Sequence, residues 1–206
     1  MAITTEQLIL EKGSELVRQN GFNNTSISLI VKAAGIPKGS FYYYFKTKEE
    51  FGVKLIEYLH ETIKPLFYSI LTDSANTNPI ERLKDFFGYF RTVFSDEDIL
   101  SGCPIGNISQ EMAATNPLLR EKLTDVFDDI TTPISLCLDQ AVSQGLLAEN
   151  SNVTEIADFI VNSWQGALIA LKVRNSPEPL IIFEKYIFDE FLKTKIPGFR
   201  YCTSGG

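Results

Sequence analysis

Cysteine and histidine are both scarce in this chain. It has three cysteines, Cys103, Cys137 and Cys202, and a single histidine, His60. An odd number of cysteines without close pairing argues against a disulfide framework or a zinc site and favours a reducing cytoplasm. One histidine leaves no second for a metal site. We therefore expect no metal and no cofactor, and we expect His60 to be structural or solvated.

Long apolar runs are also absent. No stretch approaches the 18 apolar residues that span a membrane, and we find no N-terminal signal peptide. The chain also lacks a glycine-rich phosphate loop, a placeable Ser-His-Asp arrangement and a convincing strand pattern. Its 206 residues, 44% hydrophobic and 22% charged, are ordinary for a globular protein with a full core. We predict an all-α, cytoplasmic protein without catalytic residues. A thiol-dependent enzyme that pairs a cysteine with His60 remains an alternative.

The net charge of −7 is unevenly distributed. Residues 1–48 hold six basic and three acidic side chains, whereas the remainder holds 13 basic and 23 acidic side chains. A basic head on an acidic body is typical of a protein that binds a polyanion such as DNA through one end only.

The stretch from Asn24 to Lys48 has the pattern of a helix-turn-helix. Thr25 and Ser26 are hydroxyl residues placed to cap a helix start. A run with helical spacing follows and is broken at 35–37, where glycine suits a helix end and proline suits a helix entry. A second short helix is expected at 38–45. Two short helices joined by a glycine-containing turn indicate a DNA-binding motif.

The composition of the second helix supports this interpretation. Phe41 and Phe45 lie four residues apart, so they share a face and should pack inward. Tyr42 and Tyr43 lie off that face, and a small core has no use for all their hydroxyls. The ammonium of Lys38, the hydroxyl of Ser40 and the bare backbone of Gly39 would suit phosphates and base edges.

This region resembles the DNA-binding region of the TetR family of transcriptional regulators. The matching residues are Gly21, Phe22, Thr25, Ile30, Ala34, Gly35, Ile36, Lys38, Gly39, Ser40, Phe41, Tyr42, Tyr43, Phe45, Lys48, Glu49 and Phe51. The resemblance implies a homodimer that binds a palindromic operator in double-stranded DNA. It implies a DNA-binding domain at 1–46, a ligand-binding and dimerisation domain at 47–195 and a flexible tail at 196–206. The DNA contacts it implies are Thr25, Ser26, Lys38, Gly39, Ser40, Tyr42, Tyr43 and Lys48.

Helical periodicity continues through the rest of the chain. We expect a first helix at 4–20, capped by Thr4 and Gln7 and stopped at Gly21. About six helices should follow the head, at 47–71, from 79, from about 103, at 116–144, from about 152 to 174, and from 177 to about 195. Pro65 should kink or end its helix. The phenylalanine-rich helix after Pro79 is either plain core or the wall of a cavity for an apolar ligand. The last two helices are our candidates for the dimer surface.

Cys103 lies at an expected helix start, between Gly102 and Pro104. A helix N-terminus lowers a thiol pKa, so Cys103 is either a reactive thiol or a small buried hydrophobe. Cys103, Gly106, Asn107, Glu111 and Lys172 resemble their counterparts in the TetR-family branch that includes the repressor of the N-ethylmaleimide reductase operon. The resemblance implies sensing of electrophiles or oxidants at the cysteine.

The sequence as a whole predicts a DNA-binding transcriptional regulator, most simply a repressor that a small-molecule effector releases from its operator. Activation is the alternative to repression. The effector either reacts at Cys103 or binds reversibly as an apolar or aromatic ligand. Lys172 would stabilise a thiolate, or would only extend its ammonium to solvent from a helix end. The expected effector-sensing residues are Cys103, Asn107, Lys172, Phe90 and Trp164.

Overall fold

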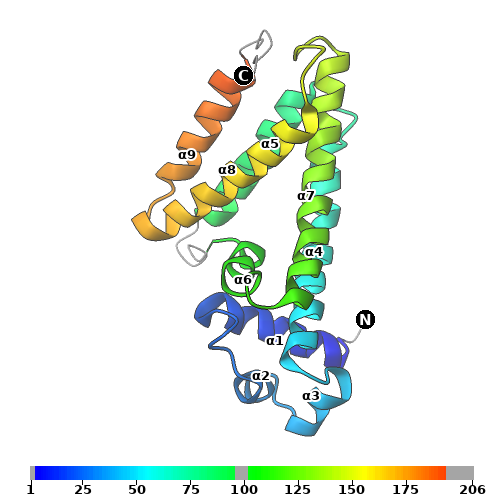
Figure 1. The fold of residues 1–206 in the computed structure, drawn as a ribbon, viewed down its shortest axis with the longest axis vertical. Coiled ribbons are helices and arrows are strands. Elements are labelled where there is room, and N and C mark those ends of the chain that lie inside the picture. Colours follow the sequence, from blue (N-terminus) through cyan, green and yellow to red (C-terminus); the bar gives the residue numbers. More distant parts are fainter. Residues whose placement is uncertain (1–2, 96–101, 194–206) are drawn as a thin grey trace, which may run out of the picture. The chain divides into compact units, whose positions relative to one another are not determined.

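The computed structural model describes residues 3–95 and 102–193, and within these ranges every regular element is helical (Figure 1). This confirms the predicted all-α fold, with three head helices followed by six more. The elements are α1 (Thr5–Asn20), α2 (Ile27–Ala33), α3 (Lys38–Tyr44), α4 (Lys48–Leu71), α5 (Pro79–Phe94), α6 (Pro104–Met112), α7 (Pro117–Ser143), α8 (Val153–Arg174), α9 (Glu178–Glu184) and the π-helical segment η2 (Lys185–Phe191).

The chain divides into two compact units. Unit 1 comprises Met1–Leu66 and Phe94–Ile130, and unit 2 comprises Phe67–Val93 and Thr131–Gly206. Helices α4 and α7 therefore contribute residues to both units. The predicted domains 1–46 and 47–195 were defined by expected function, whereas these units are defined by packing, so the domain boundaries stay a prediction. The predicted tail at 196–206 lies outside the described residues.

Local signals at both ends of α1 act as predicted. The Thr4 hydroxyl accepts the backbone N–H of Gln7 at 3.2 Å, and the Gln7 side chain accepts the N–H of Thr4 at 3.0 Å. These two bonds complete a capping box. At the other end Gly21 adopts φ +80°, a conformation that favours glycine. Phe22 follows immediately and is buried.

The helix-turn-helix is also confirmed. Ser26 caps α2, Gly35 turns the chain at φ +65°, and α3 begins after Pro37. Phe41 and Phe45 are fully buried, and each packs a ring against Phe51 at the start of α4, with centroids 5.6 Å and 5.4 Å away. The aromatic side of α3 thus forms the core of the head, as its spacing predicted.

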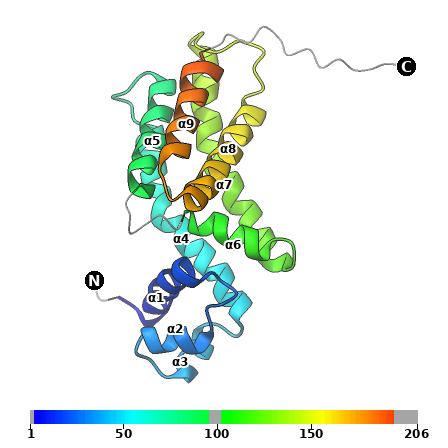
Figure 2. The same ribbon diagram turned by 90° about the vertical axis from the view of Figure 1, so that its left-hand side faces the viewer.

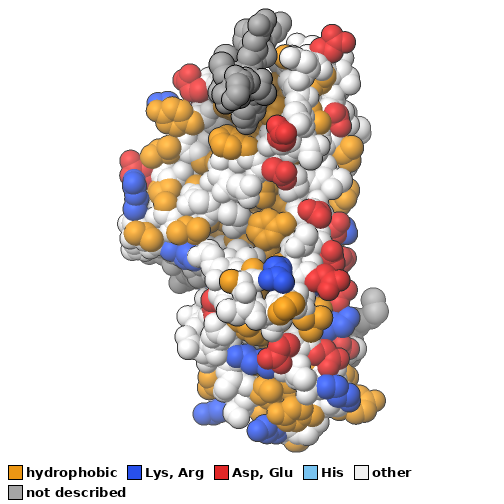
Figure 3. All heavy atoms as spheres, in the orientation of Figure 1, with side chains coloured by type: hydrophobic (Ala, Val, Ile, Leu, Met, Phe, Trp, Pro, Cys, Tyr) orange, Lys and Arg blue, Asp and Glu red, His pale blue; other side chains and the backbone are white. Residues whose placement is uncertain are grey.

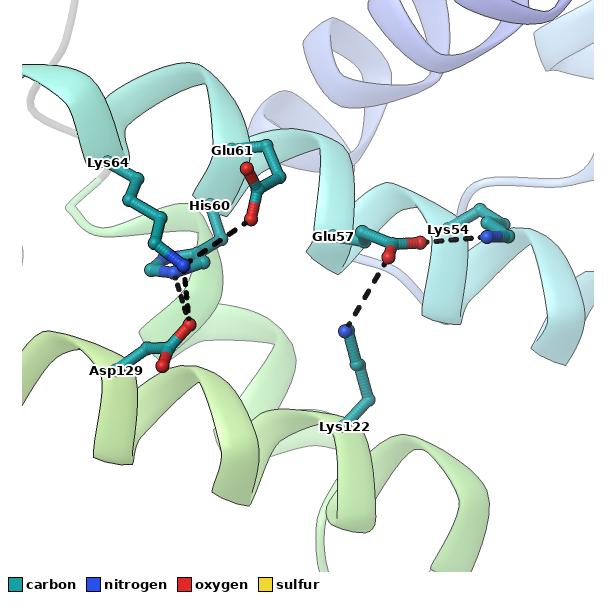
Figure 4. A network of polar contacts seen from close by, with 7 residues as sticks. All are labelled: Lys54, Glu57, His60, Glu61, Lys64, Lys122 and Asp129. Carbon is teal, nitrogen blue, oxygen red and sulfur yellow. Dashed lines mark hydrogen bonds and ion pairs between the residues drawn. The ribbon is translucent and has the colours of Figure 1, made fainter.

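A polar network joins α4 to α7 within unit 1 (Figure 4). His60 Nε2 lies 3.1 Å from Asp129 Oδ2, and Lys64 donates to the same oxygen at 3.0 Å. Lys64, with a further contribution from His60, lowers the pKa of Asp129. His60 is buried, which confirms the structural role expected for it.

Helices α4 and α7 each contain an internal proline. The sequence predicted that Pro65 would kink or end α4. The helix does not end there and continues for a further turn and a half to Leu71, whereas the kink stays a prediction. Pro133 lies inside α7 in the same way. A proline removes one backbone hydrogen bond. Buried residues beyond each proline, such as Phe67 after Pro65 and Ile134 after Pro133, favour continuation of the helix by packing.

Aromatic rings form the centre of unit 2. Phe86 packs edge-on against Phe67, and Phe87 lies 5.1 Å from both Trp164 and Phe183, measured between ring centroids. The phenylalanine-rich face of α5 is therefore occupied by ring-to-ring contacts. Arg82 is buried in the same unit, where it donates to the carbonyls of Asp73 and Asn76 and to the side chain of Gln140.

Candidate nucleic-acid interface and sensing cysteine

Helix α3 has one packed side and one open side. Phe41 is buried, whereas Lys38, Gly39, Tyr42 and Tyr43 are exposed, and Tyr43 leaves 75% of its surface accessible. Ser40 is half-buried. In Figure 3 the Lys and Arg side chains surround the lower end of the view, over α2 and α3. The open side of α3 therefore brings together five of the eight residues predicted to contact DNA.

Gly39 has no structural reason to be glycine. Its φ is not positive, and a Cβ built on it would meet no atom within 4 Å. Gly39 is the second residue of α3, in its first turn. Neither conformation nor packing requires glycine at this position, whereas close approach of a phosphate or a base edge to the backbone would.

The side chains of Thr25 and Ser26 form hydrogen bonds to the backbone just before and at the start of α2. The Ser26 hydroxyl accepts the N–H of Leu29 at 3.2 Å and so caps α2. Thr25 is 0% exposed, and its hydroxyl donates to the carbonyl of Gly21 at 2.7 Å. The predicted phosphate contact of the Thr25 side chain needs correction, because a fully buried, already donating hydroxyl cannot reach a phosphate. We reassign Thr25 to the support of the interface.

Lys48 packs on the turn between α1 and α2. Its ammonium donates to the carbonyl of Asn23 at 3.0 Å and lies 4.8 Å from the centroid of the Phe22 ring. Burial lowers the pKa of Lys48, and the nearby carboxylates of Glu49 and Glu111 oppose that shift. Lys48 is thus a partly desolvated cation at the start of α4, next to the helix-turn-helix.

Glu111 supplies contacts that sequence spacing did not predict. From the last turn of α6, its carboxylate accepts the backbone N–H of Phe22 at 3.1 Å and that of Asn23 at 2.9 Å. These partners lie 89 and 88 residues away in the sequence. The resemblance had marked Glu111 only as a matching residue, and no local pattern indicates which backbone groups it would reach.

Cys103 is the N-cap residue of α6, as predicted for a helix start at this point. Its sulfur accepts the N–H of Gly106 at 3.5 Å, and its carbonyl accepts the N–H of Asn107 at 2.9 Å. The side chain is half-buried, against the core of unit 1. A thiol at this position is accessible and faces the positive end of a helix.

Cys137 has a different environment. It is buried on α7, and its thiol donates to the carbonyl of Leu71 at 3.1 Å. Burial raises the pKa of Cys137, with a weaker opposing effect from Arg82. These features agree with its expected place in the core. Cys202 lies outside the described residues.

The predicted effector residues are divided between the two units. Cys103 and Asn107 belong to unit 1, whereas Phe90, Trp164 and Lys172 belong to unit 2. Phe90 and Trp164 are buried among other aromatic rings, and Lys172 is half-buried in the last turn of α8. Neither unit alone contains the whole set.

Two further kinds of site were sought in the described part of the chain. No group of three or more His, Cys, Asp or Glu side chains there is arranged to hold a metal ion. Within 3–95 and 102–193, no helix is both long and apolar enough to cross a membrane.

Two families match the chain. Residues 9–51 match the family described as bacterial regulatory proteins, tetR family. Residues 79–187 match the family described as tetracyclin repressor-like, C-terminal domain. Together the two matches include the helix-turn-helix and most of unit 2.

Several curated proteins are similar over most of their length. The transcriptional repressor DhaR of Mycobacterium sp. strain GP1 is 30% identical, over 90% of this chain and 91% of that protein. The regulator AcuR of Cereibacter sphaeroides is 29% identical, over 89% and 84%. The repressor NemR of Escherichia coli K12 is also 29% identical, over 85% and 88%.

Solved structures share the fold. A regulatory protein TetR from Rhodobacter sphaeroides superposes with a TM-score of 0.81 at 28% identity, covering 89% of this chain and 96% of its own. The reduced form of E. coli NemR superposes with a TM-score of 0.82 at 26% identity, covering 90% and 95%.

The two described cysteines should differ in their reaction with N-ethylmaleimide. The thiolate is the nucleophile, so the raised pKa and burial of Cys137 slow its reaction near neutral pH. We expect Cys103 to react at least about tenfold faster than Cys137 in a Cys202→Ser background. Peptide mass spectrometry at a limiting dose measures both rates.

Unfolding in guanidinium is the control, because it should make the two rates similar. Equal rates in the native protein would contradict the assignment of Cys103 as the accessible thiol.

Proposed function

Because the chain belongs to the TetR family and is a DNA-binding transcriptional regulator, we propose that it is a repressor. In this proposal a homodimer binds a palindromic operator, and a small-molecule effector releases it. The repressors named among its relatives support this direction of control. Three cysteines, an odd number without close pairing in the sequence, support a cytoplasmic location.

The observation that carries the DNA part of the proposal is the two-sided α3. Its aromatic side is buried in the head, so the open side, with Lys38, Gly39 and Tyr43, is free to enter a major groove. Tyr42 and Tyr43 would bond phosphates, and Lys38 and Ser40 would lie nearer base edges. Ser26 and Lys48 flank this helix on α2 and α4.

The dimer part rests on α8 and α9, which lie side by side in Figures 1 and 2. Hydrophobic side chains gather over these helices in Figure 3. The exposed large apolar residues are Phe159, Ile169 and Val173 on α8 and Ile181 and Ile182 on α9, followed by Tyr186 on η2. A second copy related by a two-fold axis would cover them and set two α3 helices about 34–36 Å apart, one DNA turn.

The effector part rests on Cys103. Its thiolate would add to the carbon–carbon double bond of an electrophile such as an enone. A sulfur–carbon bond forms, the π-electron pair moves to the neighbouring carbon, and that carbon takes a proton from water. One similar solved structure is the reduced form of E. coli NemR, and this supports redox control as a possibility for the present chain. The second candidate is a reversible apolar or aromatic ligand near Phe90 and Trp164, supported by the aromatic content of unit 2.

Catalysis is not part of the proposal. His60 is the only histidine in the chain, and it is buried against Asp129 (Figure 4). The role proposed for Cys103 is that of a sensor.

Tyr43→Phe should weaken operator binding about tenfold, because it removes a hydroxyl that donates to a charged phosphate. The melting temperature should not change, since the side chain is 75% exposed. Fluorescence anisotropy with a duplex that wild-type protein has selected from a random-sequence pool measures the affinity. Tyr89→Phe, an exposed tyrosine on α5, is the matched control and should bind as wild type. Wild-type affinity in Tyr43→Phe would contradict the contact.

Ile181→Glu should weaken dimerisation at least about tenfold, because each copy would bury an unpaired carboxylate in the interface. Sedimentation equilibrium over a range of protein concentrations measures the dissociation constant. Leu118→Glu replaces an equally exposed leucine on α7 in unit 1 and should leave the dimer intact. A dimer unchanged by Ile181→Glu would exclude this surface.

Cys103→Ser should abolish release of the operator by N-ethylmaleimide while leaving operator affinity unchanged. We expect the reagent to weaken DNA binding by wild type at least about fivefold, the lower end of typical allosteric coupling. Cys137→Ser is the control. Its serine can donate to the carbonyl of Leu71 as the thiol does, so the variant should fold, and the reagent should still release it from DNA because Cys103 is intact. Release of Cys103→Ser would exclude Cys103 as the sensing residue.

A further inference from the structure

The turn between α1 and α2, residues 21–25, is fastened by polar contacts from two other helices. Glu111 of α6 accepts the N–H groups of Phe22 and Asn23 at 3.1 Å and 2.9 Å. Lys48 of α4 donates to the carbonyl of Asn23 at 3.0 Å. All these residues belong to unit 1. The N–H groups of this segment therefore bond to an anionic side chain, and one of its carbonyls bonds to a cationic side chain.

Gly21 is shaped for this arrangement. Its φ of +80° is disfavoured for other residues, and a Cβ built on it would lie 2.7 Å from Oε1 of Glu111. Glycine therefore meets two requirements here, since it turns the chain and lets the carboxylate approach the following amides. The ring of Phe22 packs closely against Gly52 of α4. A Cβ built on Gly52 would lie 2.8 Å from that ring.

The turn determines where α2 begins. Ser26, the N-cap of α2, follows Asn23 by three residues, and the intervening Thr25 is fixed by its bond to Gly21. Helix α3 in turn packs through Phe41 on the same core. We propose that Glu111 is a positioning residue for DNA binding, which holds the helix-turn-helix in its DNA-reading position through the amides of Phe22 and Asn23.

This role gives α6 a direct connection to the head. Cys103 caps one end of α6 and Glu111 lies in its last turn, eight residues or about 12 Å along the axis. A displacement of this short helix would therefore move the carboxylate relative to the turn. The positioning role rests on DNA binding by the head, whereas only its link to Cys103 rests on the proposed effector.

The sign of a charge-removal experiment separates positioning from general electrostatics. A carboxylate near a DNA-binding head repels phosphates, so its neutralisation should strengthen binding if repulsion is its main effect. A positioning carboxylate behaves in the opposite way. Its neutralisation removes two charge-assisted hydrogen bonds from backbone amides, and binding should weaken.

Glu111→Gln is the test, and Glu49→Gln is its matched control. Glu49 carries the same charge next to Lys48, on an exposed side chain in the first turn of α4. With the duplex selected by wild-type protein as probe, we expect Glu111→Gln to bind at least about tenfold more weakly. Glu49→Gln should bind as tightly as wild type or more tightly. Glu111→Asp keeps the charge but shortens the reach, and it should bind as weakly as Glu111→Gln.

Hydrogen exchange of the Phe22 and Asn23 amides gives a second readout. Both amides should exchange faster in Glu111→Gln and Glu111→Asp than in Glu49→Gln, while thermal unfolding shows that each variant is folded. Wild-type affinity in Glu111→Gln, or weakened binding with both amides still protected, would overturn the positioning role. If wild type selects no duplex at all, the operator proposal fails instead. The exchange rates then decide alone, and unchanged amide protection would overturn the positioning role.

Discussion

The fold of the head depends on hydrogen-bond acceptors for two backbone N–H groups that follow α1. Where α1 stops at Gly21, the amides of Phe22 and Asn23 leave the helix and have no partner within it. The carboxylate of Glu111 satisfies both. Since the first of these amides belongs to a residue whose ring is buried, the turn cannot shift without breaking hydrogen bonds and packing together. The start of α2, and with it the path of the chain toward α3, follows from this one segment.

Helix α3 has one side that stabilises the head and one side that we propose serves recognition. Its inner side satisfies folding, since Phe41 packs against Phe45 and Phe51 in one aromatic cluster. Its outer side carries residues that helix stability does not require, a glycine in the first turn and a largely exposed tyrosine. Departures from local consistency are expected where function sets the residue. The division between the two sides is therefore itself an argument for the interface.

Features that depend on near neighbours could be predicted from the sequence. The capping box of Thr4 and Gln7, the stop at Gly21 and the inward pair Phe41 and Phe45 all involve residues within four positions of one another. Thr25 was misplaced because a hydroxyl before a helix suits both a cap and a phosphate, and only burial separates the two. The contacts of Glu111 and the pair His60–Asp129 span 69 or more residues, so no local pattern encodes them. Continuation of α4 past Pro65 likewise depends on packing beyond the proline.

Lys48 is a partly desolvated cation beside the turn. Burial lowers its pKa, so the folded state holds the ammonium less favourably than the unfolded chain does. The sign of this effect means that the stability cost is present at neutral pH and disappears only above the ordinary pKa of lysine. Asn23 offers a neutral carbonyl and Phe22 a ring face, while the two amides occupy the Glu111 carboxylate. The carboxylates of Glu49 and Glu111 oppose the shift, so part of the cost is already offset within the folded chain. A phosphate at the DNA contact proposed for Lys48 would add a further negative charge and would offset more of the same cost.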